Sequence, residues 1–259
     1  MPGGPTLKVR VYNCGRCDEK PVVLHFHGGA FVGGGLDEGS AVANAFAAAG
    51  AAVASIDYPL APEHPFPGAA EAGYAVLQWL DRQRRRLADR HAPLFVAGEE
   101  AGGNLATAVA MMARDRAGPA LAGAVLLSPM LDSCVATASH RHAKAGPVGC
   151  PWADGWRAYL SKATDALHPY AAPAHSLRLA GLPPTLLITA TDDPLRDETQ
   201  AFARRLRTAQ VPVQESLLPG PTGWPRSYRH TDAVPWSVAL VERLRPFLHA
   251  VAPEAARHP

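Results

Sequence analysis

LFVAGEEAGGN, residues 94–104, is the stretch that decides the fold class of this 259-residue chain. Residues 94–97 have the composition of a buried strand, and an apolar pattern with helical spacing begins at residue 101. Small residues at 98 and 102 allow the chain to turn sharply from strand to helix. Glu100, between them, is displayed at the head of that helix. The stretch therefore predicts a strand, a tight elbow and a helix, with Glu100 as a candidate functional residue.

Strand-like and helical stretches alternate on both sides of this elbow. The expected strands are residues 7–12, 21–26, 51–56, 94–97, 124–127, 185–189 and 213–217, and the expected helices are 38–49, 69–90, 101–114, 195–208 and 233–250. This order is typical of an α/β protein with a mostly parallel, twisted sheet and helices on both faces. The first two strands are close enough for a hairpin, whereas later strands need crossovers.

Residues 132–182 interrupt the alternation with Pro, His and Trp and contain one expected helix, at 152–161. They predict a small lid insertion. We expect a single domain over residues 1–259, because two independent domains need a longer chain.

Charge and composition restrict the partners. Lys and Arg number 25 against 23 Asp and Glu, a formal net charge of +2, so no strong field attracts nucleic acid or an anionic membrane. No apolar run approaches the roughly 20 residues of a membrane helix. We therefore expect a cytoplasmic protein with a small-molecule ligand or substrate, without nucleic-acid or membrane partners. A homo-oligomer is left open.

Four cysteines are too few for a disulfide scaffold. Cys14 and Cys17 form a lone C-x2-C pair, and a structural zinc site needs a second pair of ligands with similar spacing, which the sequence lacks. We interpret the pair as a hairpin turn and expect neither a metal nor a cofactor. Scattered histidines are more typical of packing or surface positions, although His140 and His142 lie in the expected lid.

Two further segments follow predicted strands, where open α/β sheets bind their ligands. The first is HGGAF at 27–31, in which the backbone N–H groups of Gly28 and Gly29 can approach a ligand closely and stabilise an anion. The second is TDDPLRDE at 191–198, in which Pro194 opens a helix and Asp193 lies just before its positive end.

Four segments carry a family resemblance: HGG at 27–29, DYPLAPEHPFP at 57–67, GEEAGGN at 98–104 and DPLRDE at 193–198. In these segments, and in their order and spacing, the chain resembles the hormone-sensitive-lipase-like branch of α/β-hydrolase-fold esterases over residues 20–250. The resemblance implies the α/β-hydrolase fold, Asp193 as the triad acid and the amides of Gly28, Gly29 and Ala101 as the oxyanion hole. We expect the N-terminal helical cap of that family to be largely absent.

The chain departs from the family at two members of the catalytic triad. Glu100 stands where the motif G-x-S-x-G has its nucleophilic serine, and Thr222, in GPTGW at 220–224, stands where the family has its histidine. Loss of serine or histidine costs such an enzyme on the order of 10⁶ in turnover. The triad is thus degenerate, and we expect conventional serine-esterase activity to be absent.

Four functions remain open, and the first is our main expectation. Glu100 acts as general base or carboxylate nucleophile in a lyase, isomerase or atypical hydrolase on a small carbonyl-containing molecule, with His230 or a lid histidine as a potential partner. Alternatively, the chain is a non-catalytic small-molecule binder or regulatory pseudoenzyme, an inert structural partner of another protein, or a residual carboxylesterase in which Glu100 activates water. Asp193 is either the functional acid or only a helix cap.

Overall fold

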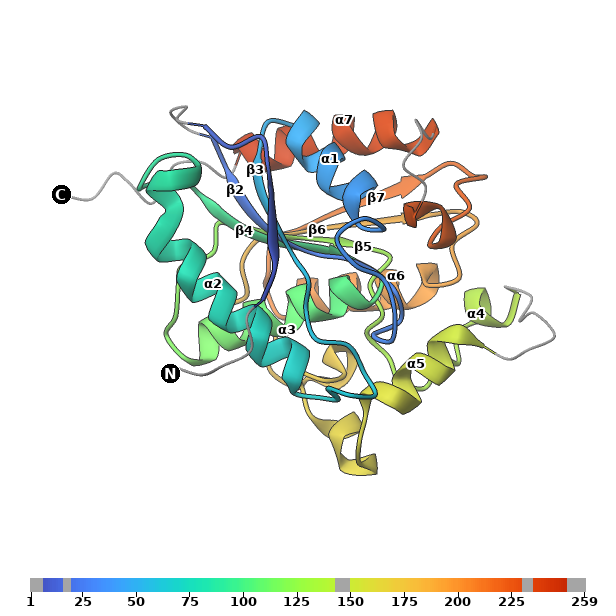
Figure 1. Ribbon diagram of the computed structural model, residues 1–259. Helices are drawn as coiled ribbons and strands as arrows, with labels where there is room; N and C mark the ends of the chain where they lie inside the picture. The colour runs from blue at the N-terminus through green and yellow to red at the C-terminus, as the bar shows by residue number, and fades with distance from the viewer. Residues whose placement is uncertain (1–6, 16–19, 143–149, 230–234, 251–259) are drawn as a thin grey trace.

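The computed structural model describes residues 7–15, 20–142, 150–229 and 235–250 (Figure 1). Its strands form one sheet in the order β1-β3-β2-β4-β5-β6-β7. They are β1 (Val9–Tyr12), β2 (Val22–Phe26), β3 (Ala52–Ile56), β4 (Leu94–Glu99), β5 (Gly123–Leu127), β6 (Thr185–Ala190) and β7 (Val213–Leu218). All neighbouring pairs are parallel except β1 with β3. The predicted mostly parallel sheet is confirmed.

The expected hairpin of the first two strands is wrong. β1 pairs antiparallel with β3, with Val9 opposite Ile56, and not with β2. All five residues of β2 are buried, and β3 and β4 occupy both of its edges, whereas β1 is half-exposed and forms the outer edge of the sheet. Two neighbouring parallel strands bury an apolar strand more completely than a hairpin at the edge. Cys14 is exposed, and Cys17 lies outside the described residues.

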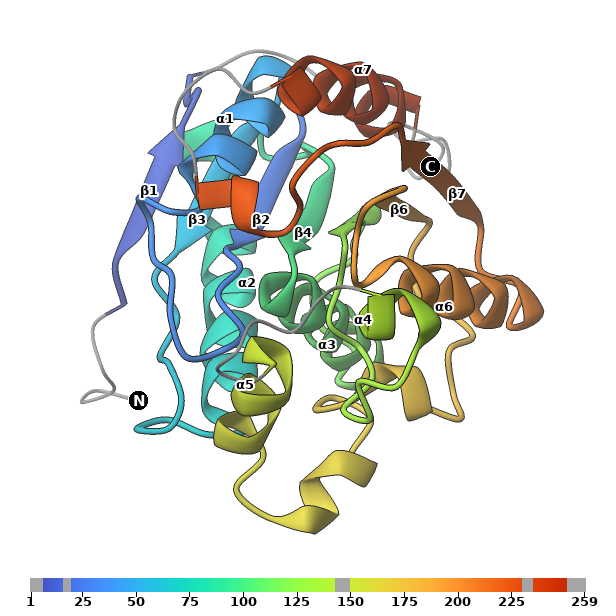
Figure 2. The same ribbon diagram turned by 90° about the vertical axis from the view of Figure 1, so that its right-hand side faces the viewer.

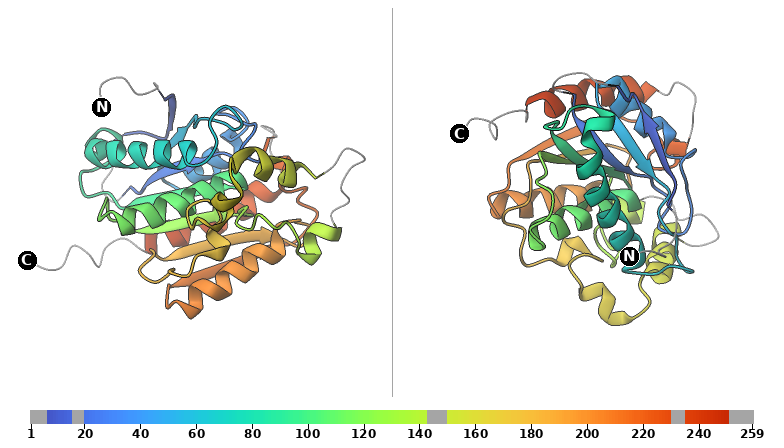
Figure 3. Two further views of the ribbon diagram at one scale, coloured as in Figure 1. Left: turned by 90° about the horizontal axis from the view of Figure 1, so that it is seen from below. Right: turned by 60° about the vertical axis from the view of Figure 1, so that its left-hand side comes forward.

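Helices cover both faces of the sheet, as predicted. α1 (Ser40–Ala48) and α7 (Pro235–Ala250) pack on one face, and α2 (Gly68–Leu87), α3 (Ala101–Asp115) and α6 (Arg196–Thr208) lie on the other (Figures 1 and 3). The core is accordingly divided into two buried clusters. On β2, Leu24 belongs to the cluster beneath α2 and α3, and Val23 to the cluster beneath α1 and α7. Alternate side chains of one buried strand therefore hold both helical layers.

The connection from β5 to β6 contains short helices at the edge where the parallel strands end (Figure 2). They are α4 (Ala138–His142), α5 (Pro151–Tyr159) and two 3-10 helices, η1 (Ala163–Leu167) and η2 (Pro173–His175). α5 confirms the helix expected near 152–161, and its Tyr159 ring stacks on Phe31 at 3.9 Å between centroids. The assignment of 132–182 as a lid within a single domain remains a prediction. Within the described ranges, no helix is long and apolar enough to cross a membrane.

Candidate active site

The elbow between β4 and α3 holds Glu100 in a strained backbone conformation. Its φ is 55° and its ψ is −117°, a region that residues with a side chain rarely adopt. The close packing of the turn demands small neighbours: a Cβ on Gly98 would lie 2.3 Å from the carbonyl oxygen of Gly102, and one on Gly102 would lie 2.0 Å from that of Phe26. These contacts confirm the predicted elbow geometry.

The Glu100 carboxylate lies against the predicted oxyanion-hole donors. The backbone N–H of Gly29 donates to Oε2 at 2.6 Å, and the indole N–H of Trp152, on α5, donates to Oε1 at 2.8 Å. Ala101 is the first residue of α3, so its N–H has no acceptor within the helix. Only 8% of Glu100 is exposed. The structure thus brings Gly29, Glu100 and Ala101 together, with the carboxylate in the place where an oxyanion would be stabilised.

A second carboxylate, that of Glu99, accepts a hydrogen bond from the other predicted donor, the Gly28 amide. The backbone N–H of Gly28 donates to Glu99 Oε1 at 3.0 Å, and Glu99 Oε2 lies 2.8 Å from His25 Nε2. The other ring nitrogen of His25 lies 2.9 Å from the Ser55 hydroxyl. All three side chains are fully buried. Sequence reasoning missed this chain of hydrogen bonds, although His25 and Glu99 are unusual as polar residues within otherwise apolar strands.

Asp193, the predicted acid, is buried at the carboxyl end of β6. It accepts hydrogen bonds from the hydroxyls of Ser128 and Thr189, and the Leu195 N–H donates to its Oδ1 at 2.9 Å. Burial raises the pKa of Asp193 because it disfavours the charged form. The bond to Leu195 is that of a cap before α6. A pocket of about 430 Å³ lies beside Asp193, and its lining includes Ser139, His142 and Arg196.

Thr222, at the position of the missing histidine, contacts Asp192 and not Asp193. Its hydroxyl donates to Asp192 Oδ1 at 2.9 Å, and its N–H donates to Oδ2 at 2.8 Å. Burial disfavours ionisation of Asp192, but hydrogen bonds from Gly223 and Thr222 outweigh it and lower the pKa. Thr222 therefore fixes its loop to the end of β6.

One histidine of the expected lid, His140 on α4, lies beside the site. Its ring contacts Trp152 edge-on at 5.5 Å between centroids, and its Nδ1 is 2.9 Å from the Thr137 hydroxyl. Burial lowers the pKa of His140 and favours the neutral imidazole. The Trp152 ring thus connects His140 to Glu100. His142 is exposed, and His230, the other suggested partner, lies outside the described residues.

An elbow at the end of a central parallel strand, opposite paired glycine amides, is the arrangement of an α/β-hydrolase active site. A profile described as the alpha/beta hydrolase fold matches residues 23–222, and the chain belongs to this family.

Relatives of the chain carry esterase names. Esterase LipI of Mycobacterium tuberculosis is 34% identical over 86% of this chain and 73% of its own length. Carboxylesterase NlhH of the same organism is 35% identical over 78% of this chain, which spans 65% of NlhH. The solved structure of a Pyrobaculum calidifontis esterase is 35% identical and superposes with a TM-score of 0.85 over 97% of this chain and 82% of that one.

These comparisons correct our main functional expectation. Non-esterase chemistry dependent on Glu100, by a lyase, isomerase or atypical hydrolase, is contradicted because the relatives and the solved structures are esterases. They favour the carboxylesterase alternative. That expectation placed too much weight on the replaced nucleophile and too little on the scaffold, which retains the elbow and the paired glycines.

Proposed function

We propose that this chain is a slow carboxylesterase that hydrolyses small neutral esters without a serine nucleophile. Glu100 acts as general base on a water molecule, which attacks the ester carbonyl. The tetrahedral oxyanion is stabilised by backbone N–H groups of the elbow and the glycine loop, chiefly those of Ala101 and Gly29. The bound water loses its proton to Glu100, and the leaving alcohol takes up a proton when the intermediate collapses.

One observation carries this proposal: the carboxylate of Glu100 lies 2.6 Å from the Gly29 amide nitrogen. A base at this position is adjacent to the donors that would polarise an ester carbonyl. Asp193 is engaged by Ser128, Thr189 and the start of α6, so we assign it a positioning role at the end of β6.

The same geometry limits the rate. Glu100 must leave the Gly29 amide before an ester oxygen can accept that hydrogen bond, and its negative charge opposes a nearby oxyanion. Serine and histidine are both missing, so the conventional acyl-enzyme route is not accessible. A pocket with its hydrogen-bond donors alone supplies roughly 10³–10⁴ over the reaction in water. The base adds to this rate and its competition for the Gly29 amide subtracts from it, so we expect turnover far below that of a serine esterase.

The test is hydrolysis of p-nitrophenyl acetate and butyrate at high protein concentration, with the uncatalysed rate subtracted. Glu100→Gln keeps the size of the side chain and removes the base, and should lower the rate at least tenfold, since general bases contribute about 10²–10⁴. Asp154→Asn, at an exposed carboxylate of α5, is the matched control and should leave the rate unchanged. Equal rates for wild type and Glu100→Gln would refute the assignment of Glu100.

Isotope labelling distinguishes the base from a carboxylate nucleophile. In a single turnover in H₂¹⁸O, direct attack by water places the label in the acid product. Attack by Glu100 would release the alcohol and form a mixed anhydride, and hydrolysis of that anhydride at the Glu100 carbonyl would leave the product unlabelled in the first turnover and place the label in the Glu100 carboxylate. Trapping the anhydride with hydroxylamine detects attack by Glu100 whichever carbonyl the water attacks.

A second candidate function is small-molecule binding without turnover. It is favoured by the occupation of both glycine amides, Gly28 by Glu99 and Gly29 by Glu100. A thermal-shift screen of neutral esters and ketones with wild type and Glu100→Gln separates the two functions. Stabilisation by an ester that is recovered intact supports binding alone, whereas stabilisation accompanied by release of acid supports the esterase.

A further inference from the structure

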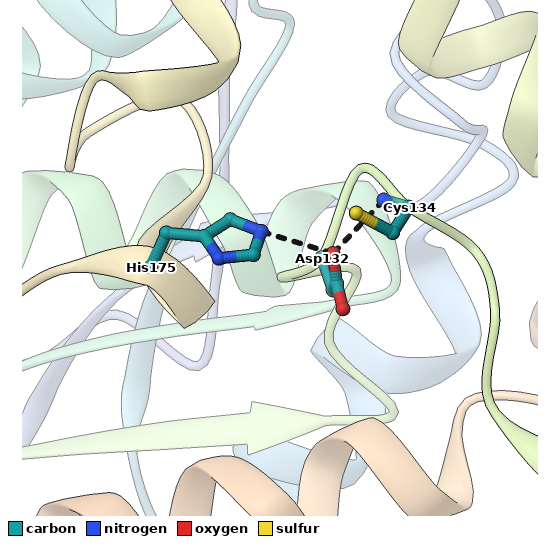
Figure 4. Close-up of side chains that lie close together, drawn as sticks. All are labelled: Asp132, Cys134 and His175. Carbon is teal, nitrogen blue, oxygen red and sulfur yellow. Dashed lines mark hydrogen bonds and ion pairs between the residues drawn. The ribbon is translucent and has the colours of Figure 1, made fainter.

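Three potential metal ligands converge at the surface, in a cluster formed by Asp132, Cys134 and His175 (Figure 4). Asp132 and Cys134 follow β5, and His175 ends η2, far along the chain. One donor atom from each lies within 4.8 Å of the other two, and His175 Nε2 is 3.1 Å from Asp132 Oδ1. His175 and Cys134 are exposed and Asp132 is half-buried, so an ion can reach the cluster from solvent.

The backbone holds the two segments together independently of these side chains. The Ala174 N–H donates to the Leu131 carbonyl at 3.1 Å. The buried Asn104 amide, on α3, donates to the carbonyls of Met130 and Ala171, one in each segment, at 2.8 and 2.9 Å. The ligands are therefore carried by neighbouring, hydrogen-bonded segments, and a site of this kind needs little reorganisation to bind an ion.

Within the first segment, a tight turn directs the side chains. The Cys134 N–H donates to Asp132 Oδ1 at 2.9 Å, and the Cys134 Sγ lies within 4.8 Å of an Asp132 carboxylate oxygen. In Figure 4 the His175 ring points toward Asp132 from the opposite segment.

We propose that Asp132, Cys134 and His175 bind one Zn²⁺ ion. Thiolate, imidazole and carboxylate are the three ligand types of zinc sites, whereas Ca²⁺ and Mg²⁺ prefer oxygen alone. Zinc bonds of about 2.0–2.3 Å in a tetrahedron place donor atoms about 3.3–3.8 Å apart. His175 Nε2 and Asp132 Oδ1, 3.1 Å apart, are already close to this spacing, so a rotation that brings the Cys134 sulfur closer to them by at most about an ångström would meet the requirement. Water completes the fourth position on the exposed side.

Zinc binding changes the protonation of two of the ligands, Cys134 and His175. The Asp132 carboxylate raises the pKa of the Cys134 thiol, so the metal-free thiol keeps its proton, which passes to solvent when the thiolate binds zinc. His175 binds through Nε2 as the neutral ring protonated on Nδ1, and its contact with Asp132 Oδ1 is replaced by the shared ion.

The test uses the full chain, purified with a chelator and kept reduced, and titrated with Co²⁺ as a spectroscopic substitute for Zn²⁺. We expect one equivalent to give a thiolate-to-cobalt charge-transfer band with the strong visible bands of tetrahedral Co²⁺, and Zn²⁺ to displace it. Cys134→Ser should abolish the charge-transfer band, and His175→Ala should weaken Zn²⁺ binding at least tenfold. The matched controls Cys14→Ser and His142→Ala, at other exposed positions, should leave both unchanged.

A weak octahedral spectrum, or a charge-transfer band that persists in Cys134→Ser, would overturn the proposal. An equal loss of the charge-transfer band or of Zn²⁺ affinity in the control variants would also overturn the proposal. Such a loss would indicate non-specific binding to surface cysteines and histidines. Circular dichroism and the unfolding midpoint without metal verify that each variant is folded. Cys134→Ser changes one exposed atom, so it remains informative if His175→Ala does not fold.

Discussion

The strain at Glu100 predicts that glycine is more stable than alanine at this position. Both Glu100→Gly and Glu100→Ala remove the carboxylate and its bonds to Gly29 and Trp152, so the two variants differ only in a Cβ atom. A non-glycine residue in a sparsely populated region, here φ 55° and ψ −117°, costs about 1–3 kcal/mol. Glycine in turn loses about 0.4–1 kcal/mol more than alanine through the entropy of the unfolded chain.

The difference between these effects favours Glu100→Gly by about 1 kcal/mol, or about 2–4 °C in Tm for a chain of this size. Urea unfolding followed by circular dichroism measures the free energy, and calorimetry measures Tm. The control is Ala201→Gly within α6, where the backbone is helical and glycine should be less stable by about 1 kcal/mol. If Glu100→Ala proves as stable as Glu100→Gly, the elbow is not strained and the reasoning fails.

Three further predictions concern buried carboxylates and the loop of Thr222. Burial raises the pKa of Glu198 well above its usual value, so the folded state binds a proton that the unfolded state releases, and stability falls as pH rises. Glu198→Gln should remove this loss of stability, which begins above the unfolded-state pKa of about 4.3, as measured by urea unfolding at a series of pH values. Thr222→Val should cost about 1 kcal/mol by removing one hydrogen bond to Asp192, and Asp192→Ala should cost more; equal losses would contradict the assigned bonds. Glu99→Ala removes the carboxylate that contacts His25 Nε2 and the Gly28 N–H and should cost about 1–3 kcal/mol in denaturant unfolding, and no measurable loss would contradict the buried contact.

The sequence predicts the sheet and its helices well, because each buried strand is a mostly apolar run and the helices carry apolar residues at helical spacing. The elbow is also predictable, since only small residues fit at Gly98 and Gly102. The pairing of β1 was not predictable from proximity along the chain. It depends on which edge of the sheet is available, and that is decided by the parallel pairing of β2 with β3 and β4.

At the candidate site, sequence reasoning named Glu100 and the glycines that the structure brings together, but not their hydrogen-bond partners. The contact of Glu100 with the Gly29 amide depends on the length of the carboxylate, and that of Trp152 with Glu100 depends on how α5 folds back over the elbow. The cluster of Asp132, Cys134 and His175 was missed for a related reason. Spacing rules detect ligands on one helix or turn, whereas His175 reaches this cluster only through the packing of η2 against the loop after β5.

At the elbow, the packing of the backbone and the chemistry of the site place separate demands on the sequence. Packing dictates Gly98 and Gly102, whose neighbours leave no space for a Cβ, whatever chemistry the site performs. Packing does not dictate the side chain at position 100, which projects toward the Gly29 amide from a backbone that the turn already holds. A carboxylate satisfies that amide much as a transient oxyanion would, and so the scaffold tolerates Glu100 with its hydrogen-bond donors in place. The similarity to esterases therefore reports the scaffold, whereas under the proposed function the rate of ester hydrolysis would depend on the single side chain that competes for the Gly29 amide.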